Sequence, residues 1–313
     1  MLGQVRPRHS KDPPLSTPFR ENLKGALFMS LAMAGYVLND AAMKQVLVQQ
    51  PLFPSIFIRG MAATVLLGLL CAFTGAFRWR WTGRDRKLIG WRVVAEAVTT
   101  LLFLSALARL PIANVTAILL AAPLAVTLAA SVFLNAPIGW RRVVALLVGF
   151  AGVMMIVRPG AASFSPWSLL ALAAVGGVVL RDLATRQLSA SVPSTLVACA
   201  TSAVITAVGA VGTLVAPLPV FTPVQVMQLV GASGLLVVGY VFSVRTMRVG
   251  DIAFVSGFRY TTLLWALLVG ILLFGEVPDV LTMLGAVLIV GSGVFSVWRE
   301  HVVATSDRRQ TNA

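Results

Sequence analysis

The sequence predicts an all-α, polytopic membrane protein whose ten transmembrane helices form two inverted five-helix repeats. Three observations lead to this prediction. Hydrophobic residues make up 58% of the 313 residues and charged residues only 12%, about half the charged fraction of a soluble domain. Ten apolar segments are each long enough to cross the hydrocarbon core of a bilayer. Basic residues fall in every second gap between these segments, and the two halves of the chain share a sequence pattern.

The ten segments follow one another with short connections. A helix needs about 20 apolar residues to span the hydrocarbon, and the segments that qualify are roughly 24–48, 52–76, 88–108, 111–134, 139–157, 166–188, 192–216, 224–248, 251–275 and 278–298. Prolines are tolerated at helix ends, and those at or near the joins are Pro51, Pro54, Pro111, Pro137, Pro159, Pro166, Pro193, Pro223 and Pro278. Pro123 lies inside the fourth segment, so we expect a kink there. Such a chain has no room for a soluble catalytic domain.

The distribution of lysine and arginine predicts the orientation. The gap 77–92 carries six basic residues, whereas the gap 49–54 carries none and the gap around Leu110 carries one, Arg109. Over the tails and the gaps together, twenty basic residues are predicted on one side of the membrane and two on the other. Because cytoplasmic loops are enriched in Lys and Arg, the rich side is predicted to be cytoplasmic. Both termini then lie in the cytoplasm, which requires an even number of spans.

The predicted organisation has four parts. Residues 1–22 form a cytoplasmic N-terminal tail, residues 23–158 the first repeat, residues 159–298 the second repeat, and residues 299–313 a cytoplasmic C-terminal tail. The N-terminal tail is too long and too polar for the n-region of a cleaved signal peptide. The net charge is +14, and the basic residues that produce it flank the apolar segments. This position indicates contact with anionic lipid headgroups and not with nucleic acid.

The two halves of the chain resemble each other. Residues 37–46 (VLNDAAMKQV) align with residues 179–188 (VLRDLATRQL), and residues 109–113 (RLPIA) align with residues 248–252 (RVGDI). Since five spans is an odd number, the second copy must enter the membrane upside down relative to the first. Inverted repeats are typical of secondary transporters, because mirrored halves can exchange roles and open alternately on each side.

Several short motifs identify a family. They are Trp140-Arg141-Arg142 leading into residues 148–153 (VGFAGV), Arg158-Pro159-Gly160, Phe258-Arg259-Tyr260, Leu273-Phe274-Gly275-Glu276 and residues 285–289 (GAVLI). With these motifs, residues 22–299 resemble the EamA-type branch of the drug/metabolite transporter superfamily. Members usually carry a hydrophobic-Gly-Glu signature after the fourth span as well, but residues 133–137 here read FLNAP, without the acid.

Asp40 and Arg59 are the clearest charged residues inside the apolar spans. At 1.5 Å per residue, both lie about 12–14 Å below the outer boundary, so they could pair across the first two spans. One interpretation makes them, with Asn39, the charged floor of a substrate cavity in which Asp40 carries a proton. The alternative is a structural ion pair that holds the two spans together.

Arg259 and Tyr260 lie about two turns inside the ninth span, with Trp265 nearby. Arginine offers a planar fork for an anionic or carbonyl group, and the aromatic rings offer stacking planes. We therefore expect these three residues in the substrate pathway. The alternative for Arg259 is a side chain that extends to the inner headgroups.

Four further charged residues have open roles. Lys44 lies one turn beyond Asp40 and either reaches the outer interface or contacts substrate. Asp182, which repeats Asp40, and Arg186 form either a solvated cluster or an inner gate, so Lys44, Asp182 and Arg186 are the candidate gate residues. Glu96 either pairs with Arg92 or faces the cavity.

The function expected from these features is secondary active transport of a small organic metabolite across a bacterial inner membrane. The histidines, His9 and His301, lie in the tails and no Walker A motif occurs, which disfavours an intramembrane enzyme or a self-powered ATPase. A channel is the other alternative. The resemblance implies vitamin or cofactor uptake, riboflavin for example, or export of amino acids or drugs. We expect a small-molecule substrate, a lipid bilayer and no cofactor; a homodimer stays open.

Overall fold

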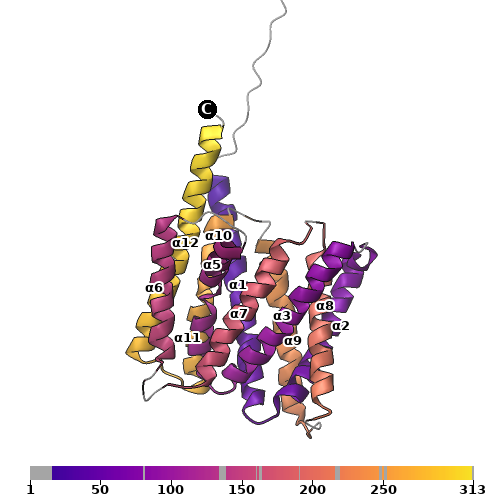
Figure 1. Ribbon diagram of the computed structural model, residues 1–313. Coiled ribbons are helices and arrows are strands. Elements are labelled where there is room, and N and C mark those ends of the chain that lie inside the picture. The colour runs from indigo at the N-terminus through magenta and orange to yellow at the C-terminus, as the bar shows by residue number, and fades with distance from the viewer. Residues whose placement is uncertain are drawn as a thin grey trace, which may run out of the picture.

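The computed structural model describes residues 16–79, 82–133, 139–159, 161, 164–189, 191–215, 219–246, 249 and 252–311. Every regular element in these ranges is a helix, and the helices run side by side in one bundle (Figure 1). They are α1 (Ser16–Leu47), α2 (Leu52–Thr74), the 3-10 helix η1 (Ala76–Arg78), α3 (Gly83–Leu107), α4 (Ile112–Leu119), α5 (Ala122–Phe133), α6 (Trp140–Val157), α7 (Trp167–Arg186), α8 (Ser194–Gly212), α9 (Pro223–Thr246), α10 (Ile252–Gly257), the 3-10 helix η2 (Phe258–Tyr260), α11 (Thr261–Phe274) and α12 (Val280–Thr311).

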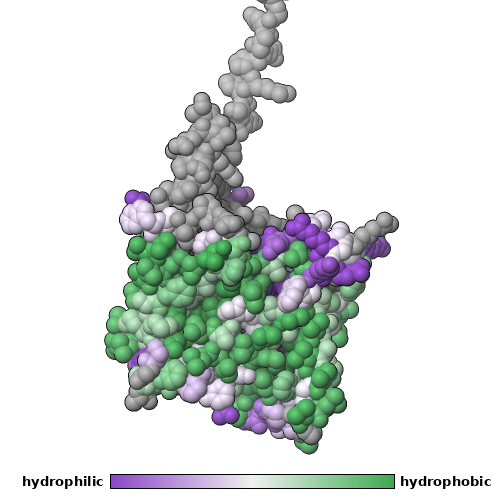
Figure 2. All heavy atoms as spheres, in the orientation of Figure 1, coloured by the Kyte–Doolittle hydropathy of each residue, from purple (hydrophilic) through white to green (hydrophobic). Residues whose placement is uncertain are grey.

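The bundle has the surface of a multi-pass membrane protein. In the described part of the chain, eight helical stretches are long and apolar enough to cross a membrane, and two shorter apolar helices, Val143–Val157 and Val280–Ser296, complete the ten predicted segments. Figure 2 shows an apolar side surface between two hydrophilic ends. Such a large exposed apolar area is stable only against lipid. The start of α1 and the end of α12 lie at the same end of the bundle (Figure 1), as an even number of spans requires.

The helices pack in pairs that can be compared with the predicted repeat. The first helix of each repeat packs against the third helix of the other, because α1 lies along α9 and α3 lies along α7. The second helices, α2 and α8, pack against each other, and so do the fifth helices, α6 and α12. This set of pairs is unchanged when the two halves are exchanged. It is therefore the packing expected of two inverted repeats related by an approximate two-fold axis.

Small residues let the paired helices approach closely. A Cβ atom added at Gly35 of α1 would lie 3.0 Å from the Leu235 carbonyl oxygen of α9. A Cβ atom added at Gly177 of α7 would lie only 2.2 Å from Thr99 Oγ1 of α3. Gly177 is the counterpart of Gly35 in the alignment of residues 37–46 with 179–188. Both crossings therefore depend on a glycine at the same place in the repeat.

The fourth helix of each repeat is broken, at equivalent positions. The first break lies between α4 and α5, directly before Pro123, which cannot donate a backbone hydrogen bond and so ends the first half-helix as predicted. The second break is η2, which separates α10 from α11. In the register that aligns 109–113 with 248–252, Arg259 and Tyr260 of η2 fall on the break in the first repeat. Discontinuous helices of this kind often border transport sites.

The predicted tails contain more helix than expected. Helix α1 already begins at Ser16, inside the predicted tail 1–22, and the backbone of α12 stays helical to Thr311, through most of the predicted tail 299–313. Residues 1–15 and 312–313 lie outside the described ranges, as do Arg248 and Asp251 of the second repeat motif and residues 134–137 of the altered signature.

Candidate functional site

A cavity of about 990 Å³ lies between the two halves of the bundle and is lined by helices of both. Eight of the ten predicted site residues line it: Asn39, Asp40, Arg59, Glu96, Asp182, Arg186, Arg259 and Tyr260. The chain has three tyrosines, and all of them, Tyr36, Tyr240 and Tyr260, line this cavity. Both helix breaks border it, through Leu120 and Pro123 on one side and through η2 on the other.

The cavity reaches one end of the bundle and not the other. Its lining includes Arg186, Ser189, Val192 and Ser194, which surround the connection between α7 and α8. Among the described residues, none in the joins 48–51, 108–111, 219–222 and 275–279 lines it. The α7–α8 connection is on the side predicted to be cytoplasmic. In that orientation the cavity opens inward and is closed outward.

The buried polar atoms without partners all belong to residues of this cavity. In the described part of the chain, four buried side-chain nitrogen or oxygen atoms lack a hydrogen-bond partner: Asn39 Oδ1, Arg59 Nε, Tyr240 Oη and Tyr260 Oη. All four belong to residues that line the cavity. An unsatisfied buried polar group costs about 1–3 kcal/mol, so native structures rarely keep one without reason. Polar atoms of a ligand, or water, are the partners that this space can supply.

Asp40 and Arg59 face the same cavity but do not pair with each other. Asp40 Oδ1 accepts a hydrogen bond of 2.9 Å from Asn39 Nδ2, and no ion pair joins Asp40 to Arg59 among the described residues. The two charges still influence each other electrostatically. The Arg59 carbonyl oxygen accepts a bond of 2.7 Å from Ser233 Oγ, which fastens α2 to α9. The expected ion pair is therefore absent from this conformation.

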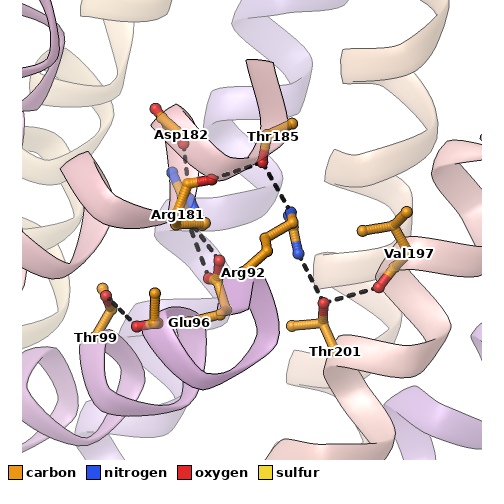
Figure 3. Close-up of polar contacts among 9 residues, drawn as sticks. Arg92, Glu96, Thr99, Arg181, Asp182, Thr185, Val197 and Thr201 are labelled. Atoms are coloured by element: carbon orange, nitrogen blue, oxygen red, sulfur yellow. Dashed lines mark hydrogen bonds and ion pairs between the residues drawn. The ribbon is translucent and has the colours of Figure 1, made fainter. Parts of the chain in front are cut away.

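A polar network connects α3, α7 and α8 along one wall of the cavity (Figure 3). Arg181 Nη1 donates to both oxygens of Glu96, at 3.1 and 3.2 Å, and Arg181 Nε donates to Asp182 Oδ1 at 2.8 Å. One arginine thus neutralises two acids. Of the two alternatives for Glu96, pairing with Arg92 and facing the cavity, the structure agrees with the second: Glu96 lines the cavity, and its ion pair is with Arg181 of the neighbouring helix.

Arg92 belongs to the same wall but binds hydroxyls and not a carboxylate. Its Nε donates to Thr185 Oγ1 at 3.1 Å, and its Nη1 donates to Thr201 Oγ1 at 2.7 Å. Each threonine donates its own proton to a helix carbonyl, Thr185 to Arg181 and Thr201 to Val197, both at 2.7 Å. Their lone pairs therefore remain available for Arg92. The network holds α3 against both α7 and α8.

Lys44 lies away from the cavity and does not extend to the outer interface. Its side chain is only 6% exposed; Nζ forms an ion pair with Glu276 and donates to the Leu110 carbonyl oxygen at 2.6 Å. The second Glu276 oxygen accepts a bond of 2.8 Å from the Ile112 backbone N–H, at the start of α4. The alternative in which Lys44 reaches the outer interface is therefore wrong. Tertiary packing provides Lys44 with an acid that is 232 residues away in the chain.

Of the three residues expected together in the ninth span, Arg259 and Tyr260 line the cavity and Trp265 does not. Arg259 is exposed to the cavity side and makes no hydrogen bond or ion pair with the described residues. Tyr260 is 6% exposed and packs against Gly293 of α12, where an added Cβ would lie 1.7 Å from its hydroxyl. Trp265 does not line the cavity; its indole Nε1 donates to Ser30 Oγ of α1 at 3.4 Å. Trp265 thus packs between helices and is no pathway residue in this conformation.

Sequence reasoning missed four cavity residues: Tyr36, Tyr240, Arg92 and Arg181. Arg181 stands directly before the repeated Asp182, and Tyr36 stands within one helical turn of Asn39 and Asp40. The scarcity of tyrosine in a chain rich in other apolar residues was the signal that could have directed attention to Tyr36 and Tyr240.

Comparison with known proteins gives matches that agree with the fold. Residues 23–158 match the EamA-like transporter family. The whole fold is similar to that of a protein of known crystal structure, with a TM-score of 0.57, 17% identity, and coverage of 92% of this chain and 99% of the other.

Three curated bacterial proteins are similar in sequence. The S-adenosylmethionine uptake transporter of Rickettsia bellii (strain RML369-C) is 27% identical over 192 residues, which cover 61% of this chain and 65% of that protein, slightly less than two thirds of its length. The riboflavin transporter of Vibrio cholerae (strain ATCC 39315) is 28% identical over 288 residues, 87% of this chain and 92% of that protein. The pseudopaline exporter CntI of Pseudomonas aeruginosa (strain UCBPP-PA14) is 28% identical over 272 residues, 85% and 93%. Residues 23–158 of this multi-pass membrane protein therefore match an EamA-like transporter domain.

Proposed function

We propose that this protein is a secondary active transporter that moves a small organic metabolite across the bacterial inner membrane. The observation that carries the proposal is the cavity of about 990 Å³ between the halves, because all four unpartnered buried polar atoms of the described residues belong to residues that line it. Its volume is at the upper end of the range of about 300–1,000 Å³ that is usual for small-ligand sites. The matches to transporters support the same function.

The proposed organisation is that of the sequence-based prediction. Residues 1–22 and 299–313 are cytoplasmic tails, and residues 23–158 and 159–298 are the two inverted repeats. In this orientation the cavity opens to the cytoplasm between α3, α7 and α8, and the contacts around Lys44 close the outer end. Transport requires the mirrored arrangement, in which the outer end opens and the inner end closes.

Riboflavin uptake is our first candidate for the transported substrate. The riboflavin transporter of Vibrio cholerae aligns with most of this chain. The three cavity tyrosines can stack on a flat ring system, and Arg259 can donate to ring carbonyls. The alternative within the same class is an exporter of amino acids or drugs, which the alignment with a pseudopaline exporter favours.

An uptake measurement tests the proposal. Cells with the gene and cells with empty vector receive a panel of labelled metabolites that includes riboflavin, amino acids and nucleosides. We expect gene-dependent movement of one chemical class, lost in Tyr260→Ala and kept in Trp265→Phe, which conserves packing outside the cavity. Transport would be contradicted if the cells with the gene contain normal levels of the protein but take up no labelled compound faster than the vector control.

A channel and an intramembrane enzyme are the rival classes. A channel needs a continuous path, whereas the described residues close one end of the cavity. We assign no catalytic residue. Saturable uptake that follows an imposed ion gradient in proteoliposomes is expected of a carrier, and linear, non-saturating flux would indicate a channel instead.

A further inference from the structure

Among the described residues, several charges inside the bundle have a partner of opposite charge, whereas Asp40 and Arg59 do not pair with each other. Arg181 binds Glu96 and Asp182, and Lys44 binds Glu276. Asp40 on α1 and Arg59 on α2 line the same cavity without forming an ion pair. A separated charge pair inside a membrane is expensive unless water or a ligand completes it. The separated pair therefore marks a place where a ligand with charges of its own can bind.

The hydrogen-bonding groups at this place are of complementary types. Arg59 has only donors, and its buried Nε has no partner. Asp40 has only acceptors, of which one oxygen receives the Asn39 Nδ2 hydrogen. Asn39 is 3% exposed, and because its nitrogen is directed to Asp40, its Oδ1 remains a buried acceptor without a donor. The site thus offers two acceptor groups, the Asp40 carboxylate and Asn39 Oδ1, and one donor group, the Arg59 guanidinium.

We propose that Asn39, Asp40 and Arg59 form a subsite for the α-amino acid group, that is, an ammonium and a carboxylate on one carbon. The ammonium has three donors for Asp40 and Asn39 Oδ1, and the carboxylate accepts the planar fork of Arg59. A neutral ring or a simple amine satisfies only half of this set. The inference rests on the proposed transport function and favours its amino acid alternative over riboflavin, which carries no such group.

The remainder of the cavity accommodates the side chain of such a substrate. Tyr36, Tyr240 and Tyr260 line it, and the hydroxyls of Tyr240 and Tyr260 have no partners among the described residues. These groups can accept an aromatic or polar side chain. A large amino acid is therefore the suitable first probe.

Binding to the purified protein in nanodiscs tests the subsite. The probes are L-tryptophan, tryptamine, which lacks the carboxylate, and indole-3-propionate, which lacks the ammonium; all twenty proteinogenic amino acids are screened by thermal shift first. Charge-assisted hydrogen bonds predict that L-tryptophan binds at least about tenfold more tightly than either relative. Equal affinities of L-tryptophan and tryptamine, or no thermal shift with any amino acid, would overturn the proposal.

Two variants should test the contacts of the ligand carboxylate and of the ligand ammonium separately. Arg59→Gln is expected to weaken L-tryptophan binding about tenfold and to leave tryptamine binding unchanged. Asp40→Asn is expected to weaken L-tryptophan and tryptamine, but not indole-3-propionate. Asp279→Asn is the control, because Asp279 pairs with Arg158 and does not line the cavity; it should keep the parental order of affinities. Equal losses for all three probes in each variant would indicate a structural role instead.

The outcome also separates this inference from the proposed function. Gene-dependent uptake of a labelled metabolite, together with no binding of any amino acid, would leave the transporter in place and disprove the subsite. Tighter binding of L-tryptophan than of tryptamine and indole-3-propionate, together with no uptake of riboflavin, would support the subsite and exclude riboflavin as the substrate.

Discussion

Lys44 of α1 and Glu276, directly after α11, form an ion pair that closes the end of the bundle opposite to the cavity opening. Glu276 also accepts a hydrogen bond from the Ile112 N–H, and Lys44 also donates to the Leu110 carbonyl oxygen. One charge pair thus joins α1, the α3–α4 connection and α11. In the transport cycle that we propose, alternating access separates these helices, so the pair would break once in every cycle.

Loss of one partner of this pair should destabilise the protein strongly. Glu276→Gln leaves the Lys44 ammonium buried without a counter-charge and should lower the free energy of unfolding by about 2–4 kcal/mol. The double variant Lys44→Met, Glu276→Leu removes both charges and should cost less than Glu276→Gln alone. Thermal unfolding in detergent measures both. A larger loss in the double variant than in the single one would contradict the assignment.

The control for this experiment is an exposed ion pair at the same end. Arg158 pairs with Asp279, whose side chain is 54% exposed. The hydrogen bond from Arg158 lowers the pKa of Asp279 to about 2, so the pair stays charged at every ordinary assay pH. Asp279→Asn should therefore change stability by no more than about 1 kcal/mol.

Substitution of Arg181 should lower the stability of the protein more than substitution of either acid that it binds. Arg181→Gln leaves Glu96 and Asp182 without their shared partner and should cost about 1–3 kcal/mol. Glu96→Gln should cost less, because Arg181 keeps its bond to Asp182. Arg186→Gln is the control on the same helix; Arg186 is exposed and has no bond to the described residues, so a change within about 0.5 kcal/mol is expected. Thermal midpoints should follow this order, and the reverse order for Arg181 and Glu96 would refute the network.

A methyl group at Gly293 should disturb the cavity through Tyr260. The Cβ of Gly293→Ala would lie 1.7 Å from Tyr260 Oη and 2.1 Å from its ring carbon Cζ, and overpacking of this kind costs about 1–3 kcal/mol. Gly291→Ala on the same helix meets nothing within 4 Å and should behave like the parent. Adding Tyr260→Ala to Gly293→Ala should restore stability but not substrate binding. Equal behaviour of the two alanine variants in unfolding assays would disprove this contact.

Membrane topology can be tested with reporter fusions. Fusions at Pro51 and Pro219 should report the periplasmic side, and a fusion at the C-terminus should report the cytoplasm, because the basic residues lie on the cytoplasmic side. A C-terminus outside the cytoplasm would contradict the orientation in which the cavity opens inward.

The sequence by itself determined the membrane architecture. Apolar segments of about 20 residues specify spanning helices because every backbone polar group must be satisfied inside lipid, and eight long and two shorter apolar helices occupy the predicted segments. Pro123 predicted the break of the fourth helix for an equally local reason, its missing N–H. The repeat alignment predicted that Asp40 and Asp182 are counterparts, and both line the cavity.

Only the tertiary structure decided which charges pair. Glu96 binds Arg181, which is 85 residues away, and Lys44 binds Glu276, which is 232 residues away. Asp40 and Arg59, at matching depth on consecutive helices, remain apart. Depth along a helix follows from the sequence at 1.5 Å per residue, but the direction of a side chain follows from the rotation of each helix about its axis and from its rotamer. Packing between distant segments sets both, and therefore sets the partners of each charge.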